Sequence, residues 1–444
     1  MQLLKSLPVN PKKPITLCWL RRDLRLDDHH ALYQALKNSN NVLVLFIFDR
    51  NILDDLPHRE DARVHFIHTQ LAALQSKLKA MGTTLLVLHG KPLPLFEQLI
   101  ENYPITSLYA NEDYEPYAIA RDQKIKALLK EKNIPFHTYK DHVIFSPNEI
   151  IKKDHTPYTV YTPYMKQWLK AYQPQMSEPF PIASYQHKLL QIAPLPLPTL
   201  KELGFLPSTQ PIPSQYINTT LIDAYAEKRD QLAIPTSQIG IHLRFGTISI
   251  RQATKIADSH SQTWRSQLIW RNFFIMILSH YPHVIHRAFK PAYDRIPWRT
   301  DSNHFQAWCQ GKTGYPIVDA GMRELNTTGM MHNRARMITA SFLCKLLLID
   351  WRWGEAYFAE KLLDYELAAN NGNWQWAAGT GCDAAPYFRI FNPTRQQERF
   401  DPALQYIKKW VPEYNEKTYP PPIVDYTYAR KCALATYKKA LKDY

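Results

Sequence analysis

Five short apolar runs are spaced along the first third of this 444-residue chain. They cover residues 15–20, 42–48, 84–88, 107–110 and 135–139. Amphipathic segments separate them, and continuous apolar runs of this length are typical of parallel strands that are buried on both faces. Alternating strands and helices of this kind predict a doubly wound, parallel-sheet α/β domain over residues 14–145.

This predicted domain lacks the glycine-rich phosphate turn of dinucleotide-binding sheets. Only Gly82 and Gly90 occur before residue 200, and neither follows the first strand. We therefore expect no NAD site of the usual kind. A charged segment, residues 21–28, follows the first strand instead. It lies at the edge of the sheet where α/β proteins bind ligands, and the alternative is a structural loop whose charges pair internally.

Residues 146–213 differ from the rest of the chain in their proline content. Nine prolines lie between Gln173 and Pro213. Because proline is excluded from helix interiors and central strands, this density predicts an interdomain connector. Its Ile, Leu and Phe content is too high for a free linker, so we expect it to pack against the folded domains.

Helical periodicity dominates the remainder of the chain, residues 214–444. The clearest helical patterns cover residues 264–278, 319–326, 332–349 and 354–363. Nine of the eleven tryptophans lie beyond residue 260. This part therefore predicts an all-α domain with an aromatic interior.

The net charge of +14 and the pI near 9.3 favour a polyanionic partner, either nucleic acid or a membrane surface, over charge that serves only solubility. No apolar run is long enough to span a membrane, and no export signal is evident at the start of the chain. The five scattered cysteines fit a reducing compartment. We expect a cytoplasmic monomer.

Histidines occur in pairs at His29-His30 and at His65 and His68. No third ligand has a suitable spacing, and histidines on helix surfaces are far commoner than metal ligands. We expect no metal site.

The stretch from Asp364 to Pro393 is unusual, because it combines aromatic, amide and carboxylate side chains without an amphipathic period. Trp374 and Trp376 lie beside paired asparagines, and several glycines would let the backbone approach a ligand. The stretch predicts a solvent-filled loop that forms a pocket for a flat polar heterocycle. The alternative is a tryptophan-rich corner of the core.

Seven segments, in this order, resemble the photolyase/cryptochrome family, and most closely its class I cyclobutane pyrimidine dimer photolyases. They read WLRRDLRLDDHHAL, YEPYAIARD, TSQIGIHLRFGTIS, LIWRNFF, GKTGYPIVDAGMREL, MHNRARMITASFLCKLLLIDWRWGE and the stretch that begins at Asp364. The resemblance implies light-driven, FAD-dependent electron transfer that splits pyrimidine dimers in UV-damaged DNA. It also implies that the charged segment after the first strand is structural.

The resemblance assigns two groups of FAD contacts. The first is a pyrophosphate clamp made by Tyr225, Thr236, Ser237, Gln238, Ile239 and Gly240. Hydroxyls and free amides at a helix start suit a phosphate, although Thr-Ser there is more often a plain helix cap. The chain departs from the family at Gln238, usually Arg, and at Gly240, usually Ser.

The second group of cofactor positions is Arg271, Asn333, Arg336, Asp364, Tyr365, Glu366 and Asn370. In the family, the carboxylate at Asp364 pairs with the arginine at Arg336 beside the isoalloxazine, and the amide at Asn370 faces the flavin N5. Arginine there helps to hold an anionic reduced flavin. Glu366 replaces the more usual Asp.

Trp298, Trp351 and Trp374 match the three tryptophans that carry electrons from the surface to the flavin in relatives. The alternative, from the residues alone, is that these large aromatics fill the core. The resemblance favours the electron-transfer chain.

The implied DNA and lesion contacts are Gln267, Trp270, Arg271, Phe274, Met330, Asn333, Arg334, Trp376 and Arg395. Aromatic rings would stack on an extruded lesion, and arginines would hold phosphates. Gln267 replaces the usual Glu of dimer photolyases, and Met330 replaces a pocket Trp. A glutamine at the position of Gln267 is also found in the branch that repairs (6-4) photoproducts, but this sequence lacks the His pair that is typical of that branch. We therefore expect dimer repair, with (6-4) repair and a cryptochrome-like photoreceptor as alternatives.

Family members often hold a second, antenna chromophore of folate or deazaflavin type. Tyr117-Ala118 stands where folate-binding relatives carry Asn-Glu. The identity of any antenna therefore stays open.

Overall fold

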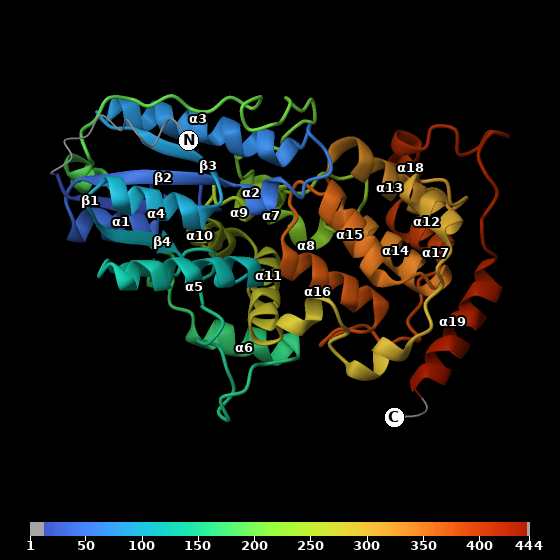
Figure 1. The fold of residues 1–444 in the computed structure, drawn as a ribbon. Helices are drawn as coiled ribbons and strands as arrows, with labels where there is room; N and C mark the ends of the chain where they lie inside the picture. Colours follow the sequence, from blue (N-terminus) through green and yellow to red (C-terminus); the bar gives the residue numbers. More distant parts are fainter. Residues whose placement is uncertain (1–12, 442–444) are drawn as a thin grey trace. The chain divides into compact units, whose positions relative to one another are not determined.

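The computed structural model describes residues 13–441, which form two compact units (Figure 1). Unit 1 comprises residues 13–146, 172–215 and 241–255, and unit 2 comprises residues 147–171, 216–240 and 256–441. Each unit therefore draws on separate parts of the chain, and the residues of the expected connector are divided between them. The three-part division of the chain stays a prediction.

Unit 1 is built on a five-stranded sheet. Its strands are β1 (Ile15–Leu20), β2 (Val42–Asp49), β3 (Leu85–Gly90), β4 (Ile105–Asn111) and β5 (Phe136–Tyr139). All neighbouring strands are parallel, and their order is β3-β2-β1-β4-β5. The first strand is therefore central, and the chain winds outward from it in both directions.

Helices cover both faces of this sheet. They are α1 (His30–Asn38) and α3 (Ala62–Ala80) on one face, and α4 (Pro92–Asn102) and α5 (Pro116–Glu131) on the other. Successive residues of β1 alternate between the two cores: Cys18 and Leu20 pack with α1 and α3, whereas Leu17 and Trp19 pack with α4 and α5. This arrangement confirms the predicted doubly wound α/β domain.

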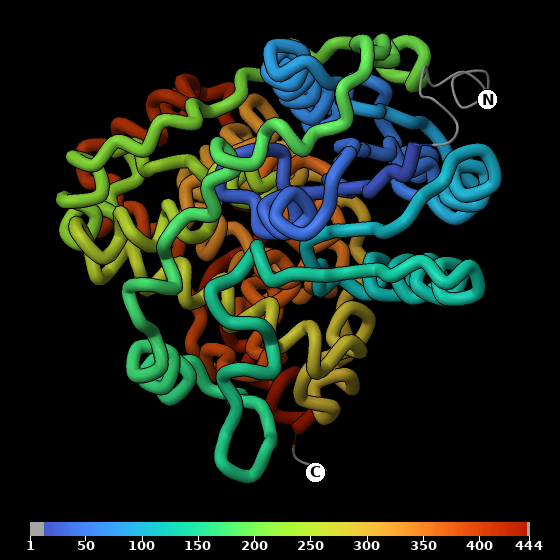
Figure 2. Tube along the Cα trace, turned by 90° about the vertical axis from the view of Figure 1, so that its left-hand side faces the viewer, coloured from blue at the N-terminus to red at the C-terminus, as the bar shows by residue number. Residues whose placement is uncertain are grey.

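The proline-rich residues 172–215 run along α3 as an extended segment of unit 1 (Figure 2). The His68 ring lies 2.9 Å from the backbone oxygen of Pro198, and the Thr83 hydroxyl donates to the backbone oxygen of Leu190 at 2.6 Å. Side chains of unit 1 therefore form hydrogen bonds with backbone oxygens of the proline-rich segment, which is not part of a helix or a sheet at these residues.

The charged segment after β1 is paired within unit 1. Arg22 contacts Glu115 at 2.9 Å, and Arg25 contacts the fully buried Asp141 at 2.5 Å. These pairs join the segment to neighbouring strand ends and leave no evident ligand site, so the structural role expected from the resemblance agrees with the geometry.

Unit 2 is helical. Its longer helices are α6 (Tyr161–Ala171), α11 (Gln262–His280), α12 (Ser302–Cys309), α13 (Pro316–Thr328), α14 (Asn333–Ser341), α15 (Trp351–Lys361), α16 (Leu367–Ala378), α17 (Pro393–Phe400) and α19 (Tyr426–Leu441), with the shorter α8 (Tyr225–Lys228) and α18 (Gln405–Trp410) between them. A large buried cluster that contains Trp308, Trp351 and Trp374 forms its core. The predicted helical domain with an aromatic interior is confirmed.

Two sequence expectations for unit 2 are wrong. The helix expected over residues 332–349 ends at Ser341, continues as a π-helical turn (Phe342–Leu346) and is followed by Leu348 at φ +52°. Residues 342–349 are buried and almost all apolar, and such a run can be buried in either geometry, so its pattern does not mark the break.

The second error concerns the stretch expected to be a solvent-filled loop. Residues 367–378 form α16, whose Asn371, Trp374 and Gln375 are buried. Its Gly372 admits an aromatic ring: a Cβ there would lie 2.1 Å from the Phe274 ring. The expected loop is therefore a helix that contributes both to the core and to the crevice described below.

Candidate active site

Two ion pairs fix the start of α16. Arg336 of α14 donates to both carboxylate oxygens of Asp364 at 2.9 and 3.1 Å, and Arg271 of α11 donates to Glu366 at 2.7 Å. The pair predicted between Arg336 and Asp364 is therefore formed, and Glu366 also reaches an arginine. Charge-assisted contacts from two helices hold both carboxylates in place.

Asn370 lies one turn further along α16 and is oriented by a residue that the sequence reasoning missed. Its amide nitrogen donates to the Glu355 backbone oxygen at 3.1 Å and to Oε1 of Glu355 at 2.9 Å. Burial raises the pKa of Glu355, although the Asn370 hydrogen bond opposes the rise. With the nitrogen engaged, the amide oxygen of Asn370 is left to accept a hydrogen bond from a ligand.

Several predicted residues meet in one crevice. It is lined by Asn333, Arg336, Met337, Ala340, Phe358, Ala369, Asn370, Asn373, Trp374, Trp376 and Ala377. The lining contains residues assigned to the flavin (Arg336 and Asn370), to electron transfer (Trp374) and to the lesion (Asn333 and Trp376). A guanidinium, an outward amide oxygen and aromatic walls form a donor and acceptor set that fits an isoalloxazine ring.

The clamp segment lies next to this crevice. A Cβ on Gly240 would come within 2.6 Å of Oδ2 of Asp364, which shows that the backbone passes directly against that carboxylate. Glycine at this position, where the family usually has serine, permits this close approach. Ile239 is buried, Thr236 and Ser237 are half-buried, and Gln238 has a left-handed φ of +49°.

Some predicted contacts lie elsewhere. Thr236, Gln238 and Met330 line a separate cavity of about 410 Å³, together with Glu324 and His332. Met330 is thus not in the crevice that Asn333 and Trp376 share. Tyr225 begins α8, where burial raises its pKa, and the half-buried Tyr365 packs against the main core cluster of unit 2.

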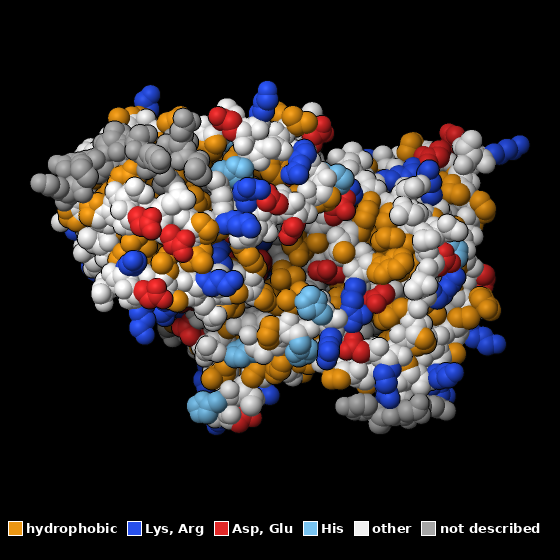
Figure 3. All heavy atoms as spheres, viewed as in Figure 1, with side chains coloured by type: hydrophobic (Ala, Val, Ile, Leu, Met, Phe, Trp, Pro, Cys, Tyr) orange, Lys and Arg blue, Asp and Glu red, His pale blue; other side chains and the backbone are white. Residues whose placement is uncertain are grey.

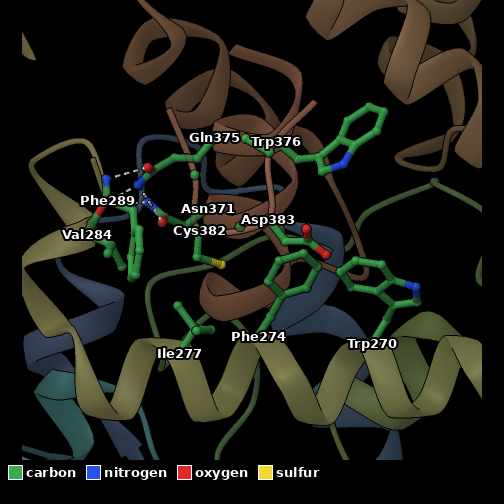
Figure 4. A pocket seen from close by; sticks show the side chains of 13 residues that line it. Trp270, Phe274, Ile277, Val284, Phe289, Asn371, Gln375, Trp376, Cys382 and Asp383 are labelled. Carbon is green, nitrogen blue, oxygen red and sulfur yellow. Dashed lines mark hydrogen bonds between the residues drawn. The ribbon is translucent and has the colours of Figure 1, made fainter. Parts of the chain in front are cut away.

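A second, apolar crevice adjoins Trp376. Trp270, Phe274 and Ile277 rise into it from α11 and face Trp376 and Asp383 (Figure 4). Trp270 and Trp376, both half-buried, therefore line one hollow, as expected for two rings that stack on a lesion.

The remaining DNA-side residues are more dispersed. Gln267 is half-buried, and its amide nitrogen donates to the Thr263 oxygen of its own helix at 3.3 Å. Arg334 pairs with Asp230 at 2.7 Å, and Arg395 is exposed in the first turn of α17. On the face shown in Figure 3, Lys and Arg side chains are spread among Asp and Glu and form no single block.

The three tryptophans of the predicted electron-transfer chain run from the core toward the surface of unit 2. Trp374 packs over Gly354, where a Cβ would meet its ring at 2.1 Å, and Trp351 lies one turn before Gly354 on α15. Trp298 is half-buried. The backbone nitrogen of Arg299 donates to the Leu348 oxygen at 2.7 Å, which brings Trp298 next to the segment that leads into Trp351.

Within the part of the chain that the structure describes, no group of three or more His, Cys, Asp and Glu side chains is placed to hold a metal ion. No helix among residues 13–441 is long and apolar enough to cross a membrane.

Comparisons with known proteins agree with this geometry. The family described as "FAD binding domain of DNA photolyase" matches residues 264–416, and the family described as "DNA photolyase" matches residues 16–183. A deoxyribodipyrimidine photo-lyase of Halobacterium salinarum is 36% identical, over 96% of this chain and 99% of its own length.

Solved structures are similar over almost the whole chain. A class III photolyase from Agrobacterium tumefaciens has a TM-score of 0.85 and 31% identity, and covers 98% of this chain and 100% of its own. A photolyase from Sulfolobus tokodaii with two FAD molecules has a TM-score of 0.82 and 32% identity, over 96% of this chain and 100% of its own.

An α/β unit followed by a helical, FAD-binding unit defines the class as a light-dependent flavoprotein. The chain belongs to the DNA photolyase family. The expected placement in class I stays a prediction.

Proposed function

We propose that this chain is a light-driven DNA repair enzyme that splits cyclobutane pyrimidine dimers. FAD is its cofactor and, when bound in reduced form, would supply light-driven electron transfer to the lesion. The observation that carries this proposal is the single crevice in which Arg336, Asn370, Trp374 and Trp376 meet. The identity of 36% with a deoxyribodipyrimidine photo-lyase along nearly its full length supports it.

The chain's own residues bind and orient the cofactor. Arg336 and Arg271 place positive charge near the start of α16, and Asp364 and Glu366 hold those guanidinium groups in position. Asn370 presents its amide oxygen because Glu355 engages the amide nitrogen. We assign Tyr225 and residues 236–240 to the pyrophosphate, where the hydroxyls of Thr236 and Ser237 and backbone amides act as donors.

Lesion recognition is assigned to the second, apolar crevice. Trp270, Phe274 and Trp376 line it and offer aromatic surface for an extruded pyrimidine dimer. Gln267 and Asn333 are assigned to the same lesion contact, and Arg334 and Arg395 to flanking phosphates. Met330 lines the separate cavity with Thr236 and Gln238, so its assignment to the lesion rests on the resemblance alone. UV-damaged DNA is the partner.

Reduction of the bound cofactor needs an electron route, and we assign it to Trp374, Trp351 and Trp298. Their order from the buried Trp374 to the half-buried Trp298 supports this direction.

A second, light-harvesting chromophore fits the family, because the Sulfolobus tokodaii photolyase with its two FAD molecules implies a novel light-harvesting cofactor in that protein. For this chain we propose an antenna of folate or deazaflavin type. A monomeric state and a cytoplasmic location remain our predictions.

The lesion type can be tested with two oligonucleotides, one with a thymine cyclobutane dimer and one with a (6-4) photoproduct. Chemically reduced, FAD-loaded protein should remove only the cyclobutane dimer, and only in light. Removal of the (6-4) product alone would overturn the assignment and identify Gln267 as the informative residue. Failure to repair either lesion would favour a photoreceptor.

A further inference from the structure

A close ring stack between Tyr161 and Trp270 has no role in the function proposed above. The rings of Tyr161 and Trp270 are nearly parallel, with an interplanar angle of 7° and 3.6 Å between their centroids. Such a short separation at this angle means that the two rings overlap face to face. One face of the Trp270 indole is thus covered by protein.

Tyr161 is itself held at several points. It is only 6% exposed, and its hydroxyl donates to the Ser266 backbone oxygen at 2.8 Å. Ser266 lies four residues before Trp270 on α11, so the hydroxyl anchors the Tyr161 ring to the same helix face that carries the indole. Phe273 contacts both rings edge-on, at 5.9 Å from Tyr161 and 5.7 Å from Trp270.

The backbone of Tyr161 is fixed from the other side of the crevice. Its backbone nitrogen donates to Oδ2 of Asp383 at 3.0 Å, and Asp383 lines the same apolar crevice as Trp270 and Trp376. Because Tyr161 begins α6, which comes from residues 147–171, this short segment connects α11 with the loop that follows α16.

Trp270 keeps part of its surface exposed in the crevice, where the Phe274 ring is tilted against it at 5.4 Å between centroids. The indole is half-buried and lines the crevice, while Tyr161 occupies the face behind it. The geometry points to Tyr161 as a positioning residue that holds the Trp270 indole in the orientation needed to stack on an extruded pyrimidine dimer. This inference rests on the proposed function, because it gives Trp270 its ligand.

The hydroxyl of Tyr161 serves as an anchor and not as an acid or base. Burial raises its pKa to about 12, so the group stays neutral under ordinary conditions. The stack should therefore depend mainly on ring overlap, and phenylalanine should retain most of it.

The test is binding of FAD-loaded protein, in the dark, to a duplex with one thymine dimer and to the same duplex without it. Stacking on an aromatic ring is worth about 1–3 kcal/mol per base, so Trp270→Ala should weaken lesion binding at least about 5-fold. Tyr161→Ala should weaken it about 5- to 10-fold and leave binding to undamaged DNA within about 2-fold. Tyr161→Phe should bind within about 3-fold of the wild type.

The deciding measurement is the double variant. If Tyr161 acts through Trp270, Tyr161→Ala adds less than about 2-fold in a Trp270→Ala background. A full additional loss in that background would overturn the inference, and so would unchanged lesion binding by Tyr161→Ala alone. Unchanged binding by Trp270→Ala would instead refute the proposed lesion contact, so the two failures are distinguishable.

Controls separate positioning from folding. Leu169→Ala changes an exposed residue of the same helix and should leave both affinities unchanged. FAD content reports the integrity of the unit for every variant. If Tyr161→Ala loses FAD, Tyr161→Leu is used instead, because leucine fills more of the space. It should likewise weaken lesion binding alone and add less than about 2-fold in the Trp270→Ala background.

Discussion

The amide nitrogen of Asn370 donates to Oε1 of Glu355 across 2.9 Å, from α16 to α15. Glu355 lies fifteen residues earlier, and burial raises its pKa. The contact fixes which end of the Asn370 amide enters the crevice. A carboxyl group outside the predicted site therefore determines how a predicted site residue meets its ligand.

Replacing this carboxyl should have a pH-dependent effect on stability. Because its pKa is raised in the folded protein, ionised Glu355 lowers the free energy of unfolding at pH values above that raised pKa. This loss disappears as the pH falls from the raised pKa to the ordinary pKa of a glutamate. Glu355→Gln removes the charge and keeps an acceptor for Asn370. The thermal midpoint of the variant minus that of the wild type should be largest near pH 8 and should decrease toward pH 5. A difference that grows as pH falls would contradict this account.

Gly354 is predicted to be required for the position of Trp374. Gly354→Ala would place a Cβ 2.1 Å from the Trp374 ring, and overpacking of a core costs about 1–3 kcal/mol. The variant should unfold at lower denaturant concentration and photoreduce its flavin more slowly. Gly90→Ala is the matched control, because its nearest neighbour is the flexible Leu95 side chain at 3.1 Å. Equal effects of the two substitutions would count against a special role for Gly354.

The tryptophan assignment predicts a separation of two activities. Trp298→Phe and Trp351→Phe should each slow photoreduction of oxidised FAD, because phenylalanine is much harder to oxidise than tryptophan. Repair by enzyme that was reduced chemically beforehand should be unaffected. Trp353→Phe, whose ring packs against Phe305, serves as the control. Photoreduction at the wild-type rate in both test variants would remove these residues from the route.

In unit 1, the buried Asp141 should be a major source of acid sensitivity. Burial alone would raise its pKa, but Arg25 and Arg251 outweigh burial and hold the pKa below its usual range. Its contribution to stability is therefore present above the ordinary pKa and is lost as pH falls below about 4.

Asp141→Asn leaves two arginines without their buried partner and should lower the free energy of unfolding by about 3–5 kcal/mol at pH 7. Urea unfolding of the protein, followed by circular dichroism, measures this loss. Asp54→Asn, which breaks an exposed pair with Arg50, is the control and should have little effect. Equal losses for the two substitutions would show that burial of Asp141 contributes nothing.

The sheet and most helices could be predicted from the sequence because their patterns are local. The apolar run at residues 42–48 matches β2, and the periodic segment at residues 264–278 falls within α11. The sequence was misleading where polar side chains are buried. The π-helical turn after Ser341 contains the buried Lys345, and α16 contains the buried Asn370, Asn371 and Gln375, so no amphipathic period marks either element.

The site residues were predicted through the resemblance, and the structure brings Arg336, Asn370, Trp374 and Trp376 together. Glu355 and Tyr161 were not predicted. Their contacts join residues 15 and 109 positions apart, and a single sequence contains no signal for pairs at such separations. Gly240 shows the reverse: its departure from the family pattern was visible in the sequence, but its close approach to Asp364 could be seen only in the structure.

The most direct test of the central claim is a single-turnover experiment with FAD-loaded protein that has been reduced chemically and mixed with a thymine-dimer oligonucleotide. Absorbance at 260 nm would be followed in light and in darkness, because splitting a dimer restores two absorbing thymines. The absorbance should rise in light and stay constant in darkness. Trp270→Ala should give a smaller rise when the protein concentration is too low to saturate the DNA. An unchanged absorbance in light, with bound reduced FAD and bound DNA both verified, would contradict the central claim.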